Sequence, residues 1–441
     1  MDWLSMSAAA LGRKIGKREI DPVDLCDAFL EAIDSHEFTD RIYARLTKDR
    51  ARSEAVAASS RARDGNRLSL LDGVPISWKD LFDTEGVATE AGSALLKGRT
   101  PEKDAAVLAN ATAAGLVCLG KTHMTELAFS GLGYNPITAS PPCINDLDAV
   151  SGGSSSGAAT SVAFGLAAIG IGSDTGGSVR VPSVWNDLVG LKTTAGRVSL
   201  EGVVPLCPRF DTVGPLTRTV EDAGLMLAAL EGRQSLDIRG APLEGARFLV
   251  LESVAFDDIR DAPRTGFEDA VDRLARAGAT VTRGTVDAVA PAMDMSGILF
   301  ATEAYGTWKD EIEANPEVMF AEVRERFRGG ARFSGADYVA AWQALERYRR
   351  AYLAATEEFD AVLVPTCPIL PPNLERLATD SAFFVAENLM TLRNTRIGNL
   401  MGLTALTLPT GIPSTGISLM CAPGSEERLL GLGLAAEAAL F

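Results

Sequence analysis

Apolar and polar residues along the first part of the chain form blocks that predict helices separated by short buried strands. The segment 22–33 follows Asp-Pro and repeats its apolar residues at helical spacing, and a second helical run covers 48–62. A turn at 71–76 leads into a short apolar strand, and a helix at 104–114 is followed by a buried strand at 117–120. A helix followed by a strand at this spacing is typical of crossover units, which join parallel strands.

The same alternation continues towards the C-terminus through a stretch rich in Gly and Ser at 151–192. There the pattern predicts a helix at 158–164, a strand at 166–172 and a helix that opens at Ser178. Further along, it predicts strands at 247–251, 280–282, 361–365, 405–409 and 417–421 and helices at 265–277, 288–330, 335–357 and 426–440. The alternation indicates an α/β fold: a large mixed, mostly parallel central sheet covered by helices on both faces.

Charge and hydropathy exclude several classes of partner. The 441 residues carry a net charge of −16, which argues against the basic surface that binding to a nucleic-acid backbone requires. No apolar run approaches the length of about 18 residues that a membrane span needs. Residues 1–19 lack the basic start and apolar core of a signal peptide. We therefore expect a cytoplasmic protein that binds neither nucleic acid nor membrane.

The histidine content narrows the chemistry. His36 and His123 are the only two histidines, whereas common hydrolase mechanisms use His as a base or as a metal ligand. His36 lies in a polar stretch and is expected to be solvated, and His123 is expected to be a hydrogen-bonded loop residue. If the protein is a hydrolase, its base is therefore not expected to be His, and no metal site is expected.

Three segments carry candidate chemistry: Gly73-Val-Pro-Ile-Ser-Trp-Lys-Asp80, Ser151-Gly-Gly-Ser-Ser-Ser-Gly157 and Gly172-Ser-Asp-Thr-Gly-Gly-Ser-Val-Arg-Val-Pro182. Together with the pieces at 190–199, 202–205 and 211–222, this ordered set resembles the amidase signature family from about residue 20 to the C-terminus. The resemblance implies a hydrolase that cuts an amide-type bond and needs no metal or organic cofactor. It also implies one amidase domain over 1–441, with a signature core at about 66–225 and a substrate-shaping lobe at about 240–385.

The resemblance assigns a catalytic triad: Ser178 as nucleophile, Ser154 as proton relay and Lys79 as base. In this family the relay Ser follows a cis peptide bond, here Gly153–Ser154. A Ser hydroxyl is a weak nucleophile until a base takes its proton, and Lys can serve as that base when burial keeps it neutral. Lys79 ends an apolar run, so a buried amine is expected. The alternatives are a surface lysine at a strand end and a flexible Gly/Ser linker.

The residues before Ser178 suit a site for a developing oxyanion. Two glycines let the backbone turn tightly, which leaves amides free to point at negative charge. We expect the donors to be the backbone amides of Thr175, Gly176, Gly177 and Ser178, aided by the field of the helix that Ser178 opens. The alternative is a phosphate-binding loop, but no Gly-Lys-Ser/Thr sequence follows.

Further residues match supporting positions of the family. Ser155, Asp174 and Arg180 correspond to positions that hold the triad by hydrogen bonds and charge, the alternatives being a helix cap and a surface ion pair. The segment 124–134 is expected to line the pocket, with Ala128 near the reacting carbonyl.

The expected substrate is a small amide, carbamate or ester, because family likeness does not choose among them. The main alternative is a glutaminase-type subunit that delivers ammonia to a partner enzyme. Against it, Val181 stands where the tRNA amidotransferase subunits usually carry Gln. A non-catalytic binding protein that retains the fold is the second alternative. A homodimer is common among the relatives.

Overall fold

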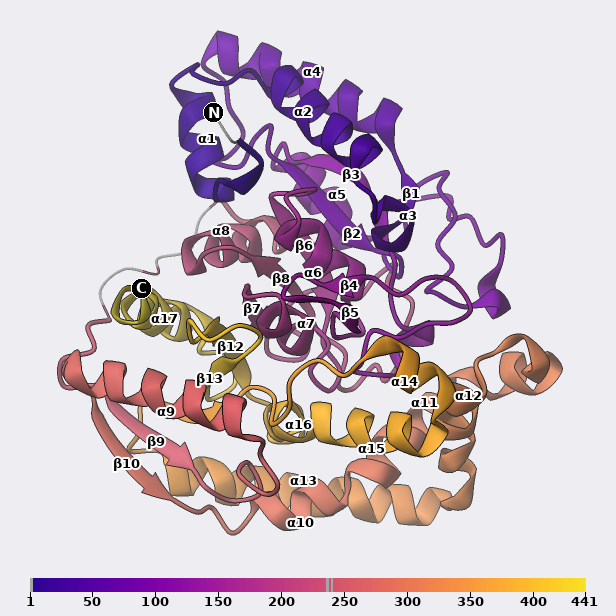
Figure 1. Cartoon of the computed structure of the whole chain (residues 1–441), viewed down its shortest axis with the longest axis vertical. Coiled ribbons are helices and arrows are strands. Elements are labelled where there is room, and N and C mark those ends of the chain that lie inside the picture. Colours follow the sequence, from indigo (N-terminus) through magenta and orange to yellow (C-terminus); the bar gives the residue numbers. More distant parts are fainter. Residues whose placement is uncertain (1–2, 235–237, 239–240) are drawn as a thin grey trace.

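The computed structural model describes residues 3–234, 238 and 241–441. Figure 1 places the N-terminal helices at one end of the molecule and the segment around 250–360 at the other, with the central sheet between them. Among the described residues, the large sheet contains eleven strands. In order across the sheet these are β1 (Tyr43–Leu46), β3 (Val117–Thr122), β2 (Pro75–Lys79), β6 (Ile169–Ser173), β8 (Val213–Thr217), β7 (Val189–Lys192), β12 (Thr404–Pro409), β13 (Gly416–Cys421), β11 (Ala361–Pro365), β9 (Arg247–Leu251) and β10 (Thr280–Gly284).

The sheet is mixed. Strands β3, β2 and β6 pair in parallel near one end, and β11, β9 and β10 pair in parallel at the other. The remaining pairs are antiparallel, so antiparallel pairs outnumber parallel ones among the described strands. The reason is visible at β12 and β13, which are consecutive and joined by a short turn, a connection that only antiparallel strands can make. A separate two-stranded sheet joins β4 (Pro142–Cys143) to β5 (Asp146–Val150).

Helices cover both faces of the large sheet. Successive side chains of a strand point to opposite faces. On β12, Leu406 lies against Gly433 of α17, whereas Thr407 lies on the other side, near Ser183 of α7. The α-helices are α1 (Ala8–Gly16), α2 (Pro22–Ser35), α3 (Thr39–Ile42), α4 (Lys48–Asp64), α5 (Ala106–Ala113), α6 (Ser156–Ala163), α7 (Arg180–Trp185), α8 (Val220–Leu230), α9 (Asp261–Arg276), α10 (Val289–Asp294), α11 (Ser296–Ala314), α12 (Ala321–Arg328), α13 (Gly335–Thr356), α14 (Leu374–Thr379), α15 (Ser381–Thr391), α16 (Arg393–Leu400) and α17 (Glu426–Leu440). The α/β fold with a large mixed sheet between helices is confirmed.

The continuous helical stretch predicted at 288–330 is wrong. Three helices, α10, α11 and α12, occupy it, and α11 ends at Ala314 just before Asn315-Pro316. Proline has no amide hydrogen and cannot continue the hydrogen-bond ladder of a helix, so the chain turns there. This break sets α12 off as a separate short helix, and α12 contributes a residue to the candidate site.

The segment expected as a lobe, about 240–385, is joined to the rest of the chain by the sheet itself, because β9, β10 and β11 belong to it. Its expected lower boundary near residue 240 lies outside the described residues. None of the helices in the described part of the chain combines the length and apolar character needed to cross a membrane.

Candidate active site

The first side chain of the site is placed by two neighbouring parallel strands. Lys79 is the last residue of β2, and Ser173 is the last residue of β6, which pairs with β2 in parallel. The carboxyl ends of parallel strands meet at the same edge of a sheet, which is where α/β proteins place their ligands. The Lys79 Nζ atom accordingly donates a hydrogen bond to Ser173 Oγ at 2.8 Å.

Ser154 reaches the same amine from the loop between β5 and α6. Lys79 Nζ donates to Ser154 Oγ at 2.7 Å, and both side chains are fully buried. The Gly153–Ser154 peptide bond is cis, as the resemblance implied. Gly153 is held tightly, because its amide donates to the Gly131 carbonyl at 2.7 Å and a Cβ there would lie 2.6 Å from Thr125 Oγ1. Only glycine fits this position.

Ser178 lies in the loop that follows β6, next to the residues around Ser154. The amide of Ser155 donates to the Ser178 carbonyl at 3.3 Å, and Ser155 Oγ lies 3.3 Å from both the amide and the carbonyl of Ser173. Ser155 thus ties the end of β6 to both serine loops. The Ser178 side chain is only 4% exposed, and it lines a cavity.

The prediction that Ser178 opens a helix is wrong by two residues, because α7 begins at Arg180. The cause is the buried carboxylate of Asp174, which accepts the amides of Gly177 at 2.9 Å and Val179 at 3.2 Å. The loop wraps around this carboxylate before the helix can begin. The helix begins after Ser178 and has only six residues. Individual backbone amides, and not the field of a helix, are therefore the groups that face negative charge at Ser178.

Asp174 is itself held by two side chains. Arg180 donates to both of its carboxylate oxygens at 3.0 Å, and Asn399 Nδ2 donates to Oδ1 at 2.9 Å. The ion pair is fully buried rather than on the surface, and it holds the pKa of Asp174 well below its usual range despite burial. This network fixes the loop that carries Ser178 against α16.

Three of the four predicted oxyanion donors are free. Within the described part of the chain, the amides of Thr175, Gly176 and Ser178 have no hydrogen-bond acceptor. Gly177 differs, because its amide is taken by Asp174. Its role is steric: its φ is +139°, and a Cβ there would lie 2.2 Å from Thr395 Oγ1. Gly177 lets the loop pack directly on α16.

The electrostatics of Lys79 favour a neutral amine. Burial lowers the pKa of Lys79 to about 7, although the nearby carboxylates of Asp174 and Asp211 act in the opposite direction. Burial also raises the pKa of Asp211, which accepts hydrogen bonds from the Thr175 hydroxyl and the Leu206 amide. Near neutral pH a large fraction of Lys79 can therefore act as a proton acceptor.

A small cavity opens beside Ser178. Thr175, Gly176 and Ser178 form one wall, and Ala128 forms another. Ala128 has a positive φ of +60°, an uncommon conformation for a residue with a side chain, and such residues gather at functional sites. Ala128 thus lines the same cavity as Ser178, and its place near the reacting carbonyl stays a prediction. Tyr134 packs elsewhere, on Phe320 and Phe384.

Several residues of the site were missed by the sequence analysis. Ser173 and Asp211 lie within the family motifs, but the motifs predicted no role for them. Thr395, Arg326 and Arg396 lie outside these motifs and were not predicted. One sequence signal did exist for α16, its run of Arg, Asn, Thr and Gly residues, and the structure shows that these residues are almost all buried. A buried helix that is polar indicates that its side chains serve other groups.

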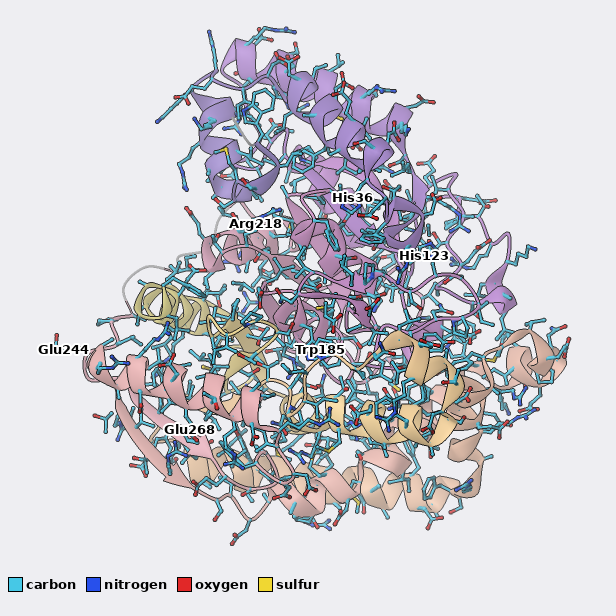
Figure 2. All side chains as sticks on the ribbon, in the orientation of Figure 1. His36, His123, Trp185, Arg218, Glu244 and Glu268 are labelled. Atoms are coloured by element: carbon cyan, nitrogen blue, oxygen red, sulfur yellow. The ribbon has the colours of Figure 1, made fainter. Side chains whose placement is uncertain are left out.

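The two histidines lie among the N-terminal elements, away from the cavity lining (Figure 2). Burial lowers the pKa of His123 to about 4, and the His36 ring packs on Phe38 and Phe164. In the described ranges, no group of His, Cys, Asp and Glu side chains is arranged to hold a metal ion. Lys79, which contacts Ser154, is a basic side chain at this site.

Comparisons with known proteins give a consistent picture. The family model described as Amidase matches residues 24–430. A 2-amino-5-chloromuconic acid deaminase of Comamonas testosteroni is 35% identical, covering 99% of this chain and 97% of that protein. One of the subunits of the glutamyl-tRNA(Gln) amidotransferase of Anaeromyxobacter sp. (strain K) is 34% identical, covering 95% and 93%. A solved structure of an amidase is 29% identical with a TM-score of 0.87, covering 99% of this chain and 100% of that one.

Proposed function

Since this chain belongs to the Amidase family and is a hydrolase that acts on C–N bonds, we propose that it works through an acyl-enzyme on Ser178, with Ser154 and Lys79 as relay and base. One observation carries the proposal. The buried amine of Lys79 bonds to Ser154 at 2.7 Å, at the strand edge beside the cavity that Ser178 lines. The substrate-shaping role of the segment 240–385 is part of the proposal, because α12 contributes Arg326 to the cavity wall.

The first half of the reaction makes the acyl-enzyme. Neutral Lys79 accepts the proton of Ser154, which in turn accepts the proton of Ser178. The Ser178 oxygen attacks the carbonyl carbon, and the negative oxygen that forms is bound by the free amides of Thr175, Gly176 and Ser178. The proton then returns through Ser154 to the departing nitrogen, and the C–N bond breaks.

The second half frees the enzyme. A water molecule loses its proton along the same path to Lys79 and attacks the ester on Ser178. The acid leaves, and Ser178 regains its proton. The relative named as a deaminase supports ammonia as a leaving group that this site can release.

A glutaminase-type subunit is the second candidate, and the relatives named as amidotransferase subunits favour it. The two candidates share the chemistry at Ser178 and differ in the need for a partner. An amidase turns over amides alone, whereas a glutaminase subunit is expected to be slow until its partner is added. Turnover of glutamine by the purified chain, compared with simple amides, separates them.

The reactivity of Ser178 is expected to rise with pH. Lys79 has its pKa lowered to about 7, so it is charged below this pH and neutral above it. The rate at which a fluorophosphonate probe labels Ser178 should therefore fall about tenfold per pH unit well below pH 7 and level off above it. The measurement is the labelling rate between pH 5 and 9 at constant ionic strength. A flat profile would contradict the assignment of Lys79 as base.

Ser154→Ala is expected to slow acylation about 10²- to 10³-fold, because the proton loses its route to Lys79. Ser156→Ala is the matched control: it also removes a buried hydroxyl two residues away, whose one hydrogen bond within the described residues goes to the His123 carbonyl. Burst kinetics with an activated ester measures acylation separately from turnover. An unchanged acylation rate in a folded Ser154→Ala protein would rule out the relay.

A further inference from the structure

A second pocket lies apart from the cavity beside Ser178, and the two share no lining residue in the described part of the chain. Its volume is about 350 Å³, which is within the range of small-molecule sites. Helix α13 supplies Arg349 and Arg350 to its lining, and the loop before β8 supplies Arg209. Three arginines around one pocket, in a chain with a net charge of −16, require an explanation.

Two of these guanidiniums lie against the same aromatic side chain. The central carbon of the Arg209 guanidinium is 4.4 Å from the centre of the Trp342 ring, and that of Arg349 is 5.5 Å from it. Burial lowers the pKa of Arg349, and repulsion from Arg209 acts in the same direction, whereas Glu346 opposes it. The fold therefore holds like charges close together at this pocket.

The protein supplies little negative charge to balance them. Among the described lining residues, Glu346 is the one acidic side chain. It pairs with Arg349 at 3.2 Å but is 51% exposed, and an exposed pair of this kind contributes little. The nearby carboxylate of Glu303 accepts the backbone amide of Arg209 at 2.8 Å. Within the described ranges, the guanidiniums of Arg209 and Arg350 have no ion-pair partner, so an anion would find them available.

The arginines also keep hydrogen-bond donors for a ligand. Arg349 uses its Nε on the Leu400 carbonyl at 2.7 Å and one further nitrogen on Glu346, which leaves the rest of its five N–H groups. Lys192 is a fourth cation in the lining, but its buried amine already donates to the carbonyls of Thr193 and Leu403. The arginines, and not Lys192, are therefore the binding groups.

This set of donors fits a phosphate group better than a carboxylate. One guanidinium fork satisfies both oxygens of a carboxylate, so three guanidiniums exceed that need. A phosphate group carries nearly two negative charges at neutral pH and has three acceptor oxygens that point in different directions. The remaining lining includes apolar side chains, Phe210, Leu353, Met401 and Pro423, which leave a place for an organic part of the ligand.

We propose that this pocket binds the phosphate group of a small molecule through Arg209, Arg349 and Arg350, at a site separate from the active site. The inference does not depend on the proposed function, because none of these arginines lines the cavity beside Ser178.

The pocket adjoins the network that fixes the Ser178 loop. Asn399 of α16 lines the pocket, accepts a hydrogen bond from Arg180 at 2.6 Å and donates one to Asp174 at 2.9 Å. Arg349 joins α13 to the last residue of the same helix, Leu400. A ligand that neutralises Arg349 therefore stabilises the contact between α13 and α16 without occupying the active site.

The test is calorimetric titration with inorganic phosphate at pH 8 and constant ionic strength. We expect a dissociation constant of about 1 mM for the unmodified protein and binding about tenfold weaker or more for Arg349→Gln and for Arg350→Gln. Arg350 is exposed and makes no hydrogen bond within the described residues, so its variant should fold even if Arg349→Gln does not. Arg347→Gln, also exposed on α13 but outside the pocket, is the matched control and should bind normally.

Two further comparisons locate the site and its ligand. Arg396→Gln, in the wall of the cavity beside Ser178, should bind phosphate as the unmodified protein does. Binding that is lost in Arg396→Gln but kept in Arg350→Gln would place phosphate in the active site and overturn the proposal. No binding by the folded unmodified protein at 20 mM phosphate, about twenty times the expected dissociation constant, would overturn it as well. Tighter binding of phenyl phosphate than of inorganic phosphate assigns the pocket to a phosphate ester, and equal binding assigns it to free phosphate.

Discussion

Lys79→Met is expected to label with a fluorophosphonate probe about 10³-fold more slowly than the unmodified protein, while it folds normally. Methionine fills a similar volume but has no amine, so the proton of Ser178 has no acceptor beyond Ser154. The fold should tolerate the change, because a buried amine carries a desolvation penalty that an apolar side chain avoids. The measurement is the second-order labelling rate at pH 8, together with a thermal melt.

Lys192→Met provides a matched control for this prediction. Lys192 is also buried, and burial lowers its pKa to about 7 as well, but within the described residues its amine donates to the carbonyls of Thr193 and Leu403 and to no hydroxyl. A lowered pKa alone therefore does not distinguish the two lysines, whereas the contact with Ser154 does. If Lys79→Met labelled as fast as Lys192→Met, Lys79 would not be the base.

Ser178→Ala is expected to lose hydrolysis of every amide substrate by about 10⁴-fold or more, since the atom that forms the acyl-enzyme is gone. The loss of one hydroxyl at a side chain that is 4% exposed should leave stability nearly unchanged. The measurement is ammonia release from a simple amide. Ser183→Ala, on α7 and outside the cavity lining, is the matched control and should keep full turnover.

The local parts of the fold were predictable, because their signals are local. The start of α2 follows from Asp21, whose side chain accepts the Val23 amide at 2.9 Å, and from proline at the first helical position. Strands β9 and β11 match their predicted ranges because each contains four consecutive apolar residues. The order in which the strands pair could not be predicted from the sequence. Antiparallel neighbours such as β7 and β12 are separated by a long stretch of chain, so no local pattern links them.

The candidate site divides in the same way. Lys79, Ser154 and Ser178 could be proposed because each lies in a motif of a known family. Arg326 and Arg396 could not, because they meet only through the packing of α12 and α16; the polar sequence of α16 was the one signal, and it points to no particular ligand. The predicted start of α7 was wrong because Asp174 accepts hydrogen bonds from the amides of Gly177 and Val179. Asp174 does so because it is buried in an ion pair with Arg180, which the sequence does not show.

The central claim is that Ser178 is an activated nucleophile, and intact mass after incubation with a fluorophosphonate probe tests it most directly. The account predicts one adduct on the unmodified chain and on Ser183→Ala, and none on Ser178→Ala under the same conditions. An adduct that persists on Ser178→Ala, or no adduct on the folded unmodified chain, would contradict it.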